Sequence, residues 1–406
     1  MGRLILFLTL MFPSSFLYTQ NHPVISVDFP GGNILVDGSQ HMSTLYYDVL
    51  TDTIHLRPDL RDTKGKWFYW YFRVTGAEGK RFHFQFPFNA MTSFGPAIST
   101  DEGNTWKWLY EETRSIYDSF SYSFGPSDSS VLFCLGIPYL EKDFKKFANH
   151  YATHPLVSLH TLTKSEKGRD IEEMRIRSKE VTPEYKMVIT ARHHACEMMA
   201  SYVLEGFLES VLDGENQEMK WLRNHVEFVV IPFVDKDGVE DGDQGKYRIP
   251  RDHNRDYSGD IIYNSTRAIQ NKVKSWGGKS KLIGMDLHCP TLSGMWNEHA
   301  YFVGTSENAH QQKRFVNTLV KHHRGILDLD TTNLLLEYGQ RWNTASNYTQ
   351  GTGFISWMTT LAETSLGILL EFPYANNMGQ QISPHNARIF GRDMAEALAI
   401  YLEGNP

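Results

Sequence analysis

Apolar and polar residues alternate along much of the first third of the chain. A dense aromatic run at 66–74 (KWFYWYFRV) is followed by a glycine-containing turn and by the alternating segment 81–86 (RFHFQF). Alternation with a period of two is typical of strands, and two such runs joined by a short turn predict an antiparallel hairpin. Further strands are expected at 119–124 and 129–135. Because these strands recur without a long helical pattern, residues 21–143 are predicted to form an antiparallel β-sandwich.

The pattern changes after Pro138, where apolar positions begin to recur at helical spacing. Short apolar strands then alternate with helical segments, and this alternation predicts an α/β domain over residues 144–406. The boundary carries no linker rich in proline or glycine, so the two domains are expected to pack closely. Strands are expected at 187–190, 226–233, 282–287 and 367–372, and helices at 139–151, 198–212 and 387–404.

The first twenty residues follow a different pattern. Arg3 precedes an apolar run at 4–12, and Pro13 with two serines follows it. This order is typical of a secretory signal peptide, and the run is shorter than the roughly 20 apolar residues that cross a bilayer. We therefore expect residues 1–20 to be a signal peptide and the protein to be secreted or periplasmic. No later segment has about 18 uninterrupted apolar residues, so no membrane span is expected.

Composition narrows the class of protein without choosing a function. The 40 basic and 47 acidic side chains give a net charge of −7, which argues against nucleic acid as a partner because such binding requires a basic face. The three cysteines, an odd number, exclude a disulfide scaffold. The function must therefore be sought in local motifs.

The first motif is the turn after the strand at 187–190. His194 and Glu197 form an H-x-x-E pair, and at the start of a helix this spacing turns an imidazole and a carboxylate toward one point. Two histidines, a glutamate and a water form a known catalytic zinc set, so a third protein ligand is expected elsewhere. His193 is the competing imidazole. The spacing favours His194, which leaves His193 as a supporting or an exposed residue.

Two more strand ends carry candidate residues. His288 follows the apolar strand at 282–287, and Glu371 closes the strand that begins at Gly367. In α/β sheets, sites gather at the C-terminal ends of the strands. An unpaired buried glutamate is costly, so Glu371 is expected to act as a base beside a zinc-activated water. The alternative is a salt-bridge partner.

Between the candidate ligands lies a stretch rich in arginine. Residues 247–257 contain Arg248, Arg251, Asn254 and Arg255. Guanidinium forks and amide groups are donors that bind carboxylates, so this stretch is a candidate for recognising one. The alternative is a solvated basic loop.

Taken in order, these motifs resemble the M14 family of zinc metallocarboxypeptidases. The family carries H-x-x-E, a D-G-V-like turn, N-R, a distant histidine, a tyrosine loop and a glutamate at a strand end. This chain has each in that order, with D-G-V at 237–239 and a tyrosine loop at 347–357. The resemblance covers residues 140–403 and implies an α/β/α catalytic domain with a mixed twisted sheet. The preceding strands resemble the β-sandwich of the cytosolic carboxypeptidase subfamily. The expected signal peptide does not fit a cytosolic location, and a secreted bacterial relative of that subfamily would explain both features.

The resemblance implies a zinc hydrolase. One zinc ion per chain would be held by His194, Glu197 and His288. Glu371 would activate the water and shuttle its proton. Zinc, rather than another divalent metal, follows from the ligand types.

The resemblance also implies how a substrate would be held. Arg248 would polarise the scissile carbonyl, with Arg251 as the competing residue. Asn254 and Arg255 would grip the terminal carboxylate, and Tyr348 would close over it. The predicted substrate is therefore a peptide with a free C-terminal carboxylate, cut at its last peptide or isopeptide bond.

Two residues bear on which substrate side chain the enzyme would prefer. Ile355 falls where the family places its specificity residue, and an isoleucine there disfavours basic side chains. Arg251 is the candidate for accepting an acidic side chain, which the glutamate preference of the resembled subfamily would require. Trimming of cell-wall peptides is a further use for a secreted bacterial enzyme.

Two other classes of function remain open. One is an amidohydrolase or deacylase on the same scaffold, which would release an acyl group from an amino acid. The other is a zinc-free protein that binds peptides or glycans, although all the catalytic positions look intact. Cys196 and Cys289 each adjoin a predicted ligand. They are expected to be small buried residues, with a disulfide between them as the alternative.

Overall fold

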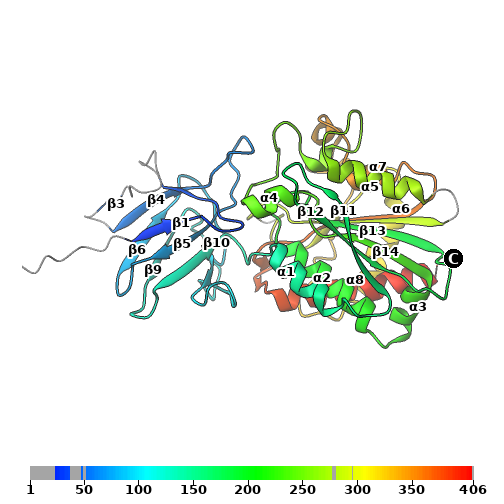
Figure 1. Ribbon diagram of the computed structural model, residues 1–406, viewed down its shortest axis with the longest axis horizontal. Coiled ribbons are helices and arrows are strands. Elements are labelled where there is room, and N and C mark those ends of the chain that lie inside the picture. Colours follow the sequence, from blue (N-terminus) through cyan, green and yellow to red (C-terminus); the bar gives the residue numbers. More distant parts are fainter. Residues whose placement is uncertain (1–22, 37–46, 49–51, 277–279, 295, 405–406) are drawn as a thin grey trace, which may run out of the picture.

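The structure is a computed structural model that describes residues 23–36, 47–48, 52–276, 280–294 and 296–404. The predicted signal peptide at 1–20 lies outside the described residues. Two bodies lie end to end, a smaller one built from strands and a larger one in which helices cover a sheet (Figure 1). Within the described ranges, none of the helices is both long and apolar enough to cross a membrane.

The smaller body is a β-sandwich of two sheets. The first sheet has the order β1-β5-β10-β7-β8 and the second β2-β4-β6-β9, with β3 paired to β4. All pairs are antiparallel except β4 and β6, which run parallel. The strands are β1 (Val24–Ser26), β2 (Leu35–Val36), β3 (Tyr47–Asp48), β4 (Thr53–Arg57), β5 (Tyr71–Thr75), β6 (Arg81–Gln85), β7 (Ala97–Ser99), β8 (Lys107–Trp108), β9 (Ser119–Ser123) and β10 (Ser130–Cys134).

The predicted hairpin between the aromatic run and the next strand is wrong. β5 and β6 lie in different sheets, so the turn between them carries the chain across the sandwich. Their aromatic rings meet across the core, with the ring centroids of Phe72 and Phe84 5.8 Å apart. A period of two shows which side chains face the core, but it does not choose the partner strand.

The larger body is built on an eight-stranded mixed sheet with the order β11-β12-β14-β13-β15-β18-β16-β17. The central strands β14, β13, β15 and β18 are parallel to one another. They are buried on both faces, which explains their nearly continuous apolar sequences. The strands are β11 (Val157–Lys164), β12 (Asp170–Ile176), β13 (Tyr185–Ala191), β14 (Val226–Ile231), β15 (Lys281–His288), β16 (Tyr301–Val303), β17 (Leu335–Leu336) and β18 (Thr364–Glu371), with a separate pair β19 (Asn376–Asn377) and β20 (Gln380–Gln381).

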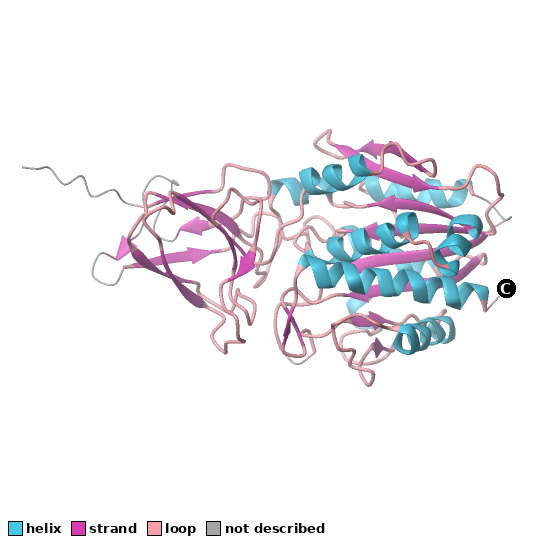
Figure 2. Cartoon of the chain, turned by 90° about the horizontal axis from the view of Figure 1, so that it is seen from below, coloured by secondary structure: helices cyan, strands magenta, loops and turns pink. Residues whose placement is uncertain are grey.

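Helices cover both faces of this sheet (Figure 2). On one face α8 packs against α2, α3 and α6, while on the other α5 lies over β11 and α7 over β15 and β18. The fold is therefore the α/β/α arrangement that the resemblance implies. The helices are α1 (Glu141–His150), α2 (Met199–Asp213), α3 (Gln217–His225), α4 (Lys236–Asp241), α5 (Asn264–Ser275), α6 (Ala309–His322), α7 (Phe354–Met358) and α8 (Pro384–Glu403).

The two bodies are joined by buried polar contacts. Tyr69 and Gln244 exchange two hydrogen bonds, in which the Tyr69 amide donates at 2.7 Å and the Gln244 amide group donates back to the Tyr69 carbonyl at 2.8 Å. The Trp108 indole donates to the carbonyl of Ile382 at 2.6 Å. Apolar residues of both bodies also belong to one continuous core. The sandwich is thus packed closely on the α/β body, as the missing linker indicates.

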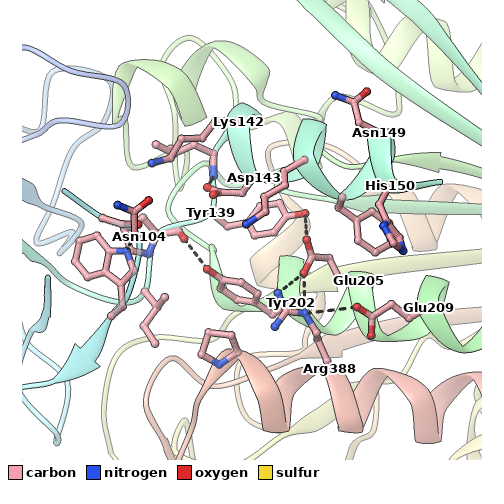
Figure 3. Close-up of a pocket in the computed structure, with 18 of the residues that line it drawn as sticks. Asn104, Tyr139, Lys142, Asp143, Asn149, His150, Tyr202, Glu205, Glu209 and Arg388 are labelled. Carbon is pink, nitrogen blue, oxygen red and sulfur yellow. Dashed lines mark hydrogen bonds and ion pairs between the residues drawn. The ribbon is translucent and has the colours of Figure 1, made fainter. Parts of the chain in front are cut away.

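A cleft of about 920 Å³ opens between the sandwich, near Trp106, and the helices α1, α2 and α8 (Figure 3). Its buried polar groups are largely paired with one another. Glu205 accepts hydrogen bonds from the Tyr139 hydroxyl at 2.7 Å and from Arg388 Nη2 at 2.6 Å. The residues that line this cleft include none of the predicted site residues, most of which line a second cavity.

Candidate active site

Three parallel strands deliver the predicted ligands and base to one place. His194 and Glu197 lie in the turn between β13 and α2, His288 is the last residue of β15, and Glu371 is the last residue of β18. In the sheet register, His288 pairs with Glu371, and the preceding Leu287 pairs with the end of β13. The C-terminal ends of parallel strands meet at one edge, so residues that are far apart in sequence converge.

The predicted ligand atoms form a tight group. His194 Nδ1 lies 2.9 Å from one Glu197 oxygen, and His288 Nδ1 lies 2.7 Å from the other. One donor atom from each of the three residues lies within 4.8 Å of the others. Two imidazole nitrogens and a carboxylate are the donor set of a catalytic zinc site, so these residues fit the metal. Burial opposes the charge of Glu197, but its cationic neighbours hold its pKa well below the ordinary value.

A carboxylate supports each of the two histidines. His194 Nε2 lies 3.0 Å from Asp252, and His288 Nε2 lies 2.7 Å from Asp286. Such pairs fix the tautomer and the orientation of a ligating imidazole, here with Nδ1 toward Glu197. The sequence motifs assign no function to Asp252 and Asp286. An aspartate two residues from a predicted site residue, as in D-x-H and D-x-N, was the available signal.

His193 supports this arrangement from behind. Its ring is fully buried, with Nδ1 2.8 Å from Asp286 and Nε2 2.8 Å from the hydroxyl of Tyr257. With Asp286 and His288 it forms a second group of potential donors. Both of its nitrogens are already engaged, and it does not line the cavity that His194 and His288 line. His193 is therefore the supporting residue of the two alternatives.

Glu371 has the environment of a proton carrier. It is 9% exposed, and its Oε2 has no hydrogen-bond partner among the described residues. Burial, with a smaller contribution from the charge of Glu197, raises the pKa of Glu371 to about 7. A carboxyl group whose pKa lies near neutrality can both accept and donate a proton, as a general acid–base requires.

These residues open onto a cavity of about 320 Å³. It is large enough for one amino-acid side chain with part of the neighbouring backbone. Of the predicted residues, His194, His288, Glu371, Asn254, Arg255, Tyr348 and Ile355 line it, joined by Trp67, Lys246, Tyr247, Tyr301 and Trp342.

The predicted carboxylate-binding residues lie together on one wall. Arg255 Nη1 donates to the carbonyl of Asn254 at 2.7 Å, and its guanidinium lies 5.2 Å from the ring centre of Tyr348. Asn254 ties the wall to α7, because its Oδ1 accepts the amide hydrogen of Phe354 at 2.8 Å. Ile355, 1% exposed, borders the same cavity. The wall thus combines a fixed guanidinium with an apolar surface.

The positions of Arg248 and Arg251 do not fit their predicted roles. Arg248 donates to Asp235 at 2.6 Å and to Asp243 at 2.9 Å, and Arg251 donates to Asp256 at 2.8 Å. Neither arginine is among the residues that line the cavity. Both guanidiniums are held by buried carboxylates, which turn them away from a substrate.

Lys246 is the cation that sequence reasoning missed. Its ammonium group lies 2.5 Å from Glu197 Oε1 and donates to the carbonyl of Cys289 at 3.1 Å. Burial disfavours its charge, but Glu197 outweighs burial and raises the pKa of Lys246 above its ordinary value. A charged ammonium group therefore stands next to the predicted metal ligands, two residues before the arginine that the resemblance favoured.

Replacing Arg248 by methionine is expected to destabilise the fold. The side chain of Arg248 is 12% exposed, and its loss would leave Asp235 and Asp243 buried without a cation. Breaking such a pair costs about 3–5 kcal/mol. Urea unfolding measures this cost, and Arg73→Met is the control because the Arg73–Glu102 pair is about half exposed and such a pair near the surface is worth about 1 kcal/mol or less. Equal losses in both variants would contradict the structural role.

The structure shows whether the cysteines pair. Cys134, Cys196 and Cys289 are free and buried. The thiol of Cys196 instead lies 3.6 Å from the hydroxyl of Tyr374. The expectation of small buried residues is confirmed, and the alternative disulfide is wrong.

The α/β body is similar to a known protein family. Residues 142–318 match the family described as zinc carboxypeptidase. Among curated relatives, cytosolic carboxypeptidase 2 of Xenopus tropicalis is 29% identical over 36% of this chain, and cytosolic carboxypeptidase 6 of Caenorhabditis elegans is 25% identical over 66% of it. The matches cover 16% of the first relative's length and 62% of the second's. Tyr348 and Glu371 lie beyond residue 318, where the family match ends.

Solved structures share the fold over nearly the whole chain. A metallo-carboxypeptidase from Burkholderia cenocepacia superposes with a TM-score of 0.74 and 18% identity, covering 95% of this chain and all of the other. A metallo-carboxypeptidase from Pseudomonas aeruginosa, in complex with (2-guanidinoethylmercapto)succinic acid, gives 0.71 and 20%, with 93% and 99% covered. The sandwich and the α/β body therefore occur together in other proteins.

Proposed function

We propose that the chain is a zinc carboxypeptidase that removes the C-terminal residue from peptides, since residues 142–318 match the family of that description. One observation carries the proposal. Glu371, the two histidines of the metal-ligand group and Arg255 border the same small cavity. A base, a metal site and a carboxylate anchor within reach of one bound residue are the parts that hydrolysis of a terminal peptide bond requires.

His194, Glu197 and His288 would hold the zinc ion. Bound there, zinc would supply Lewis acidity, which makes water a nucleophile near neutral pH and polarises a carbonyl group. Asp252 and Asp286 would keep both imidazoles pointing at the ion.

Glu371 would accept the proton of the attacking water at Oε2. It would then donate this proton to the nitrogen of the leaving amino acid. Because the pKa of Glu371 is raised to about 7, its protonated and deprotonated forms are similar in free energy at neutral pH, so it can both accept and donate the proton. The hydrophobic burial that raises the pKa also keeps other water away from the reacting atoms.

Lys246 would take the role that the sequence analysis gave to Arg248. Its ammonium group would stabilise the negative charge that develops on the scissile carbonyl oxygen. In the structure this group pairs with Glu197, which would also hold the metal, so Lys246 would have to turn from Glu197 toward the substrate.

Arg255, supported by Tyr348, would bind the terminal carboxylate. Whether the bond cut is a peptide or an isopeptide bond depends on the residue upstream, because Arg255 holds only the carboxylate. Ile355 would favour an uncharged C-terminal side chain.

The test compares peptides that differ only at the C-terminus. The native protein, loaded with about one zinc per chain, is expected to release the last residue from a free acid and not from the matching amide. Arg255→Met should lower kcat/KM for the acid by about 100-fold, since charge-assisted bonds are worth about 1.5–3 kcal/mol. Arg251→Met is the control outside the cavity. Cleavage of acyl-amino acids without cleavage of peptides would favour the deacylase instead.

A further inference from the structure

The sandwich contributes one residue to the catalytic cavity among those that the structure describes, Trp67. Its ring stacks on Tyr247 with the ring centroids 5.3 Å apart and the planes at 28°. The Lys246 ammonium group lies 5.9 Å from the indole. The indole nitrogen donates to the carbonyl of Lys64 at 3.1 Å, which fixes the orientation of the ring. Trp67 and Tyr247 thus form a flat aromatic wall beside Lys246.

The sandwich also holds the loop that carries the other half of this wall. Asp62 accepts the amide hydrogens of Gln244 at 3.1 Å and of Gly245 at 2.9 Å. The Thr63 hydroxyl donates to the carbonyl of Lys246 at 2.6 Å. Tyr247 has a φ of 47°, in the left-handed region that a bulky residue rarely adopts. Contacts from the sandwich therefore maintain a backbone conformation that the loop would not choose alone.

The braced loop lies directly on the metal-ligand segment. A Cβ at Gly245, whose φ is +77°, would come within 2.2 Å of the Ala195 nitrogen. Because no side chain separates the two backbones, Lys246 reaches Glu197 and the aromatic wall starts next to the metal ligands. The wall is therefore placed by the sandwich at the reacting end of the cavity.

Exposed aromatic side chains lie at and beside the cavity. Tyr247 is 52% and Trp342 38% exposed, and both line the cavity. Trp296, 45% exposed, lies 4.4 Å from the guanidinium of Arg341, which also lies 5.6 Å from the ring of cavity-lining Tyr301. Exposed apolar surface gathered at a cavity is typical of a binding site.

The residues at the two ends of the cavity indicate which substrate residue would contact this aromatic wall. Arg255 marks the end where the terminal carboxylate is proposed to bind, and Lys246 marks the position of the scissile carbonyl. The chain upstream of that carbonyl then leaves past Lys246, where Trp67 and Tyr247 stand. We propose that Trp67 and Tyr247 form the subsite for the penultimate residue, and that this subsite selects an aromatic side chain. The proposal rests on the proposed carboxypeptidase function.

The test uses N-acylated dipeptides with one common C-terminal residue and alanine, phenylalanine or glutamate before it. The native zinc enzyme is expected to prefer phenylalanine over alanine by about tenfold in kcat/KM, which is the scale of an aromatic pair. Trp67→Ala should remove this preference, because it should lower kcat/KM for the phenylalanine peptide about tenfold more than for the alanine peptide. Trp67→Phe should keep most of the preference.

Two controls separate recognition from folding. Tyr247→Ala changes an exposed side chain and should reduce the same preference. Trp106→Ala removes a half-buried tryptophan of the same domain that lines the other cleft, and it should leave the preference unchanged. Thermal unfolding of each variant verifies that the fold is intact.

The outcomes distinguish the inference from the proposed function. If the native enzyme cuts all three peptides equally, or if Trp67→Ala slows them by the same factor, the subsite assignment is overturned while the carboxypeptidase stands. If a glycosylated penultimate residue is preferred over phenylalanine, the wall stacks on sugars and the aromatic side-chain assignment is overturned. If no peptide is cut, the proposed function itself fails.

Discussion

Replacing Glu371 by glutamine is expected to abolish peptide hydrolysis while the metal stays bound. The substitution keeps the size of the side chain and its position at the end of β18, but it removes the group that accepts a proton. General acid–base catalysis contributes about 10²–10⁴-fold to a rate, so kcat should fall by at least that factor. KM should change little, because the carboxylate anchor at Arg255 is untouched.

Measuring bound zinc distinguishes loss of the proton-accepting group from loss of the metal site. Glu371 is not one of the three grouped donors, so zinc measured on the purified variant should remain at about one per chain. Glu337→Gln is the matched control, since Glu337 is half exposed and pairs with Lys313 outside the cavity. A Glu371→Gln enzyme that retains more than a tenth of native kcat would remove Glu371 from the proton-transfer role. Loss of zinc would instead make it a ligand.

The strand-end residues could be predicted because of the way parallel sheets are built. The sequence shows that His194, His288 and Glu371 follow apolar strands, and the geometry of such sheets brings their ends together. The partner of each residue was harder to predict. Asp286 sits two residues before His288 on the same strand, yet only the structure shows that its two oxygens hold His288 and His193.

Spacing within a loop could not decide which cation faces the substrate. Lys246 and Arg248 are two residues apart, and either one satisfies the pattern of a basic residue before N-R. The choice depends on Asp62, Asp235 and Asp243, which surround Arg248 and hold it away from the cavity. Asp62 comes from the sandwich, so this information lies far from the motif in sequence.

Contacts between residues far apart in sequence also decide how the strands of the sandwich pair. Its strands were predicted from alternation, but the pairing of β5 and β6 with other strands depends on contacts across the core. The sequence pattern predicts Trp67 to be part of an aromatic strand. It precedes β5, and its ring turns toward the other domain to line the catalytic cavity. The sandwich therefore supplies part of the cavity lining.

Replacing Lys246 by methionine is the second prediction with a large expected effect. The change keeps an unbranched side chain of similar length and removes only the ammonium group. Loss of one group that stabilises developing charge costs about 10²–10³-fold in kcat. KM should rise little, because the proposed interaction strengthens only as the carbonyl oxygen gains charge. Lys246→Arg should recover part of the rate.

Metal binding gives this prediction a second readout. Lys246 pairs with Glu197 at 2.5 Å, so in the metal-free protein its ammonium group competes with a cation for the same carboxylate. Lys246→Met should therefore hold zinc at least as tightly as the native protein when titrated against a chelator, although it cuts peptides slowly. Arg248→Met should show the opposite pattern, with reduced stability and a nearly native kcat in the folded fraction. If Lys246→Met cuts peptides normally and a folded Arg248→Met does not, the carbonyl-polarising role returns to Arg248.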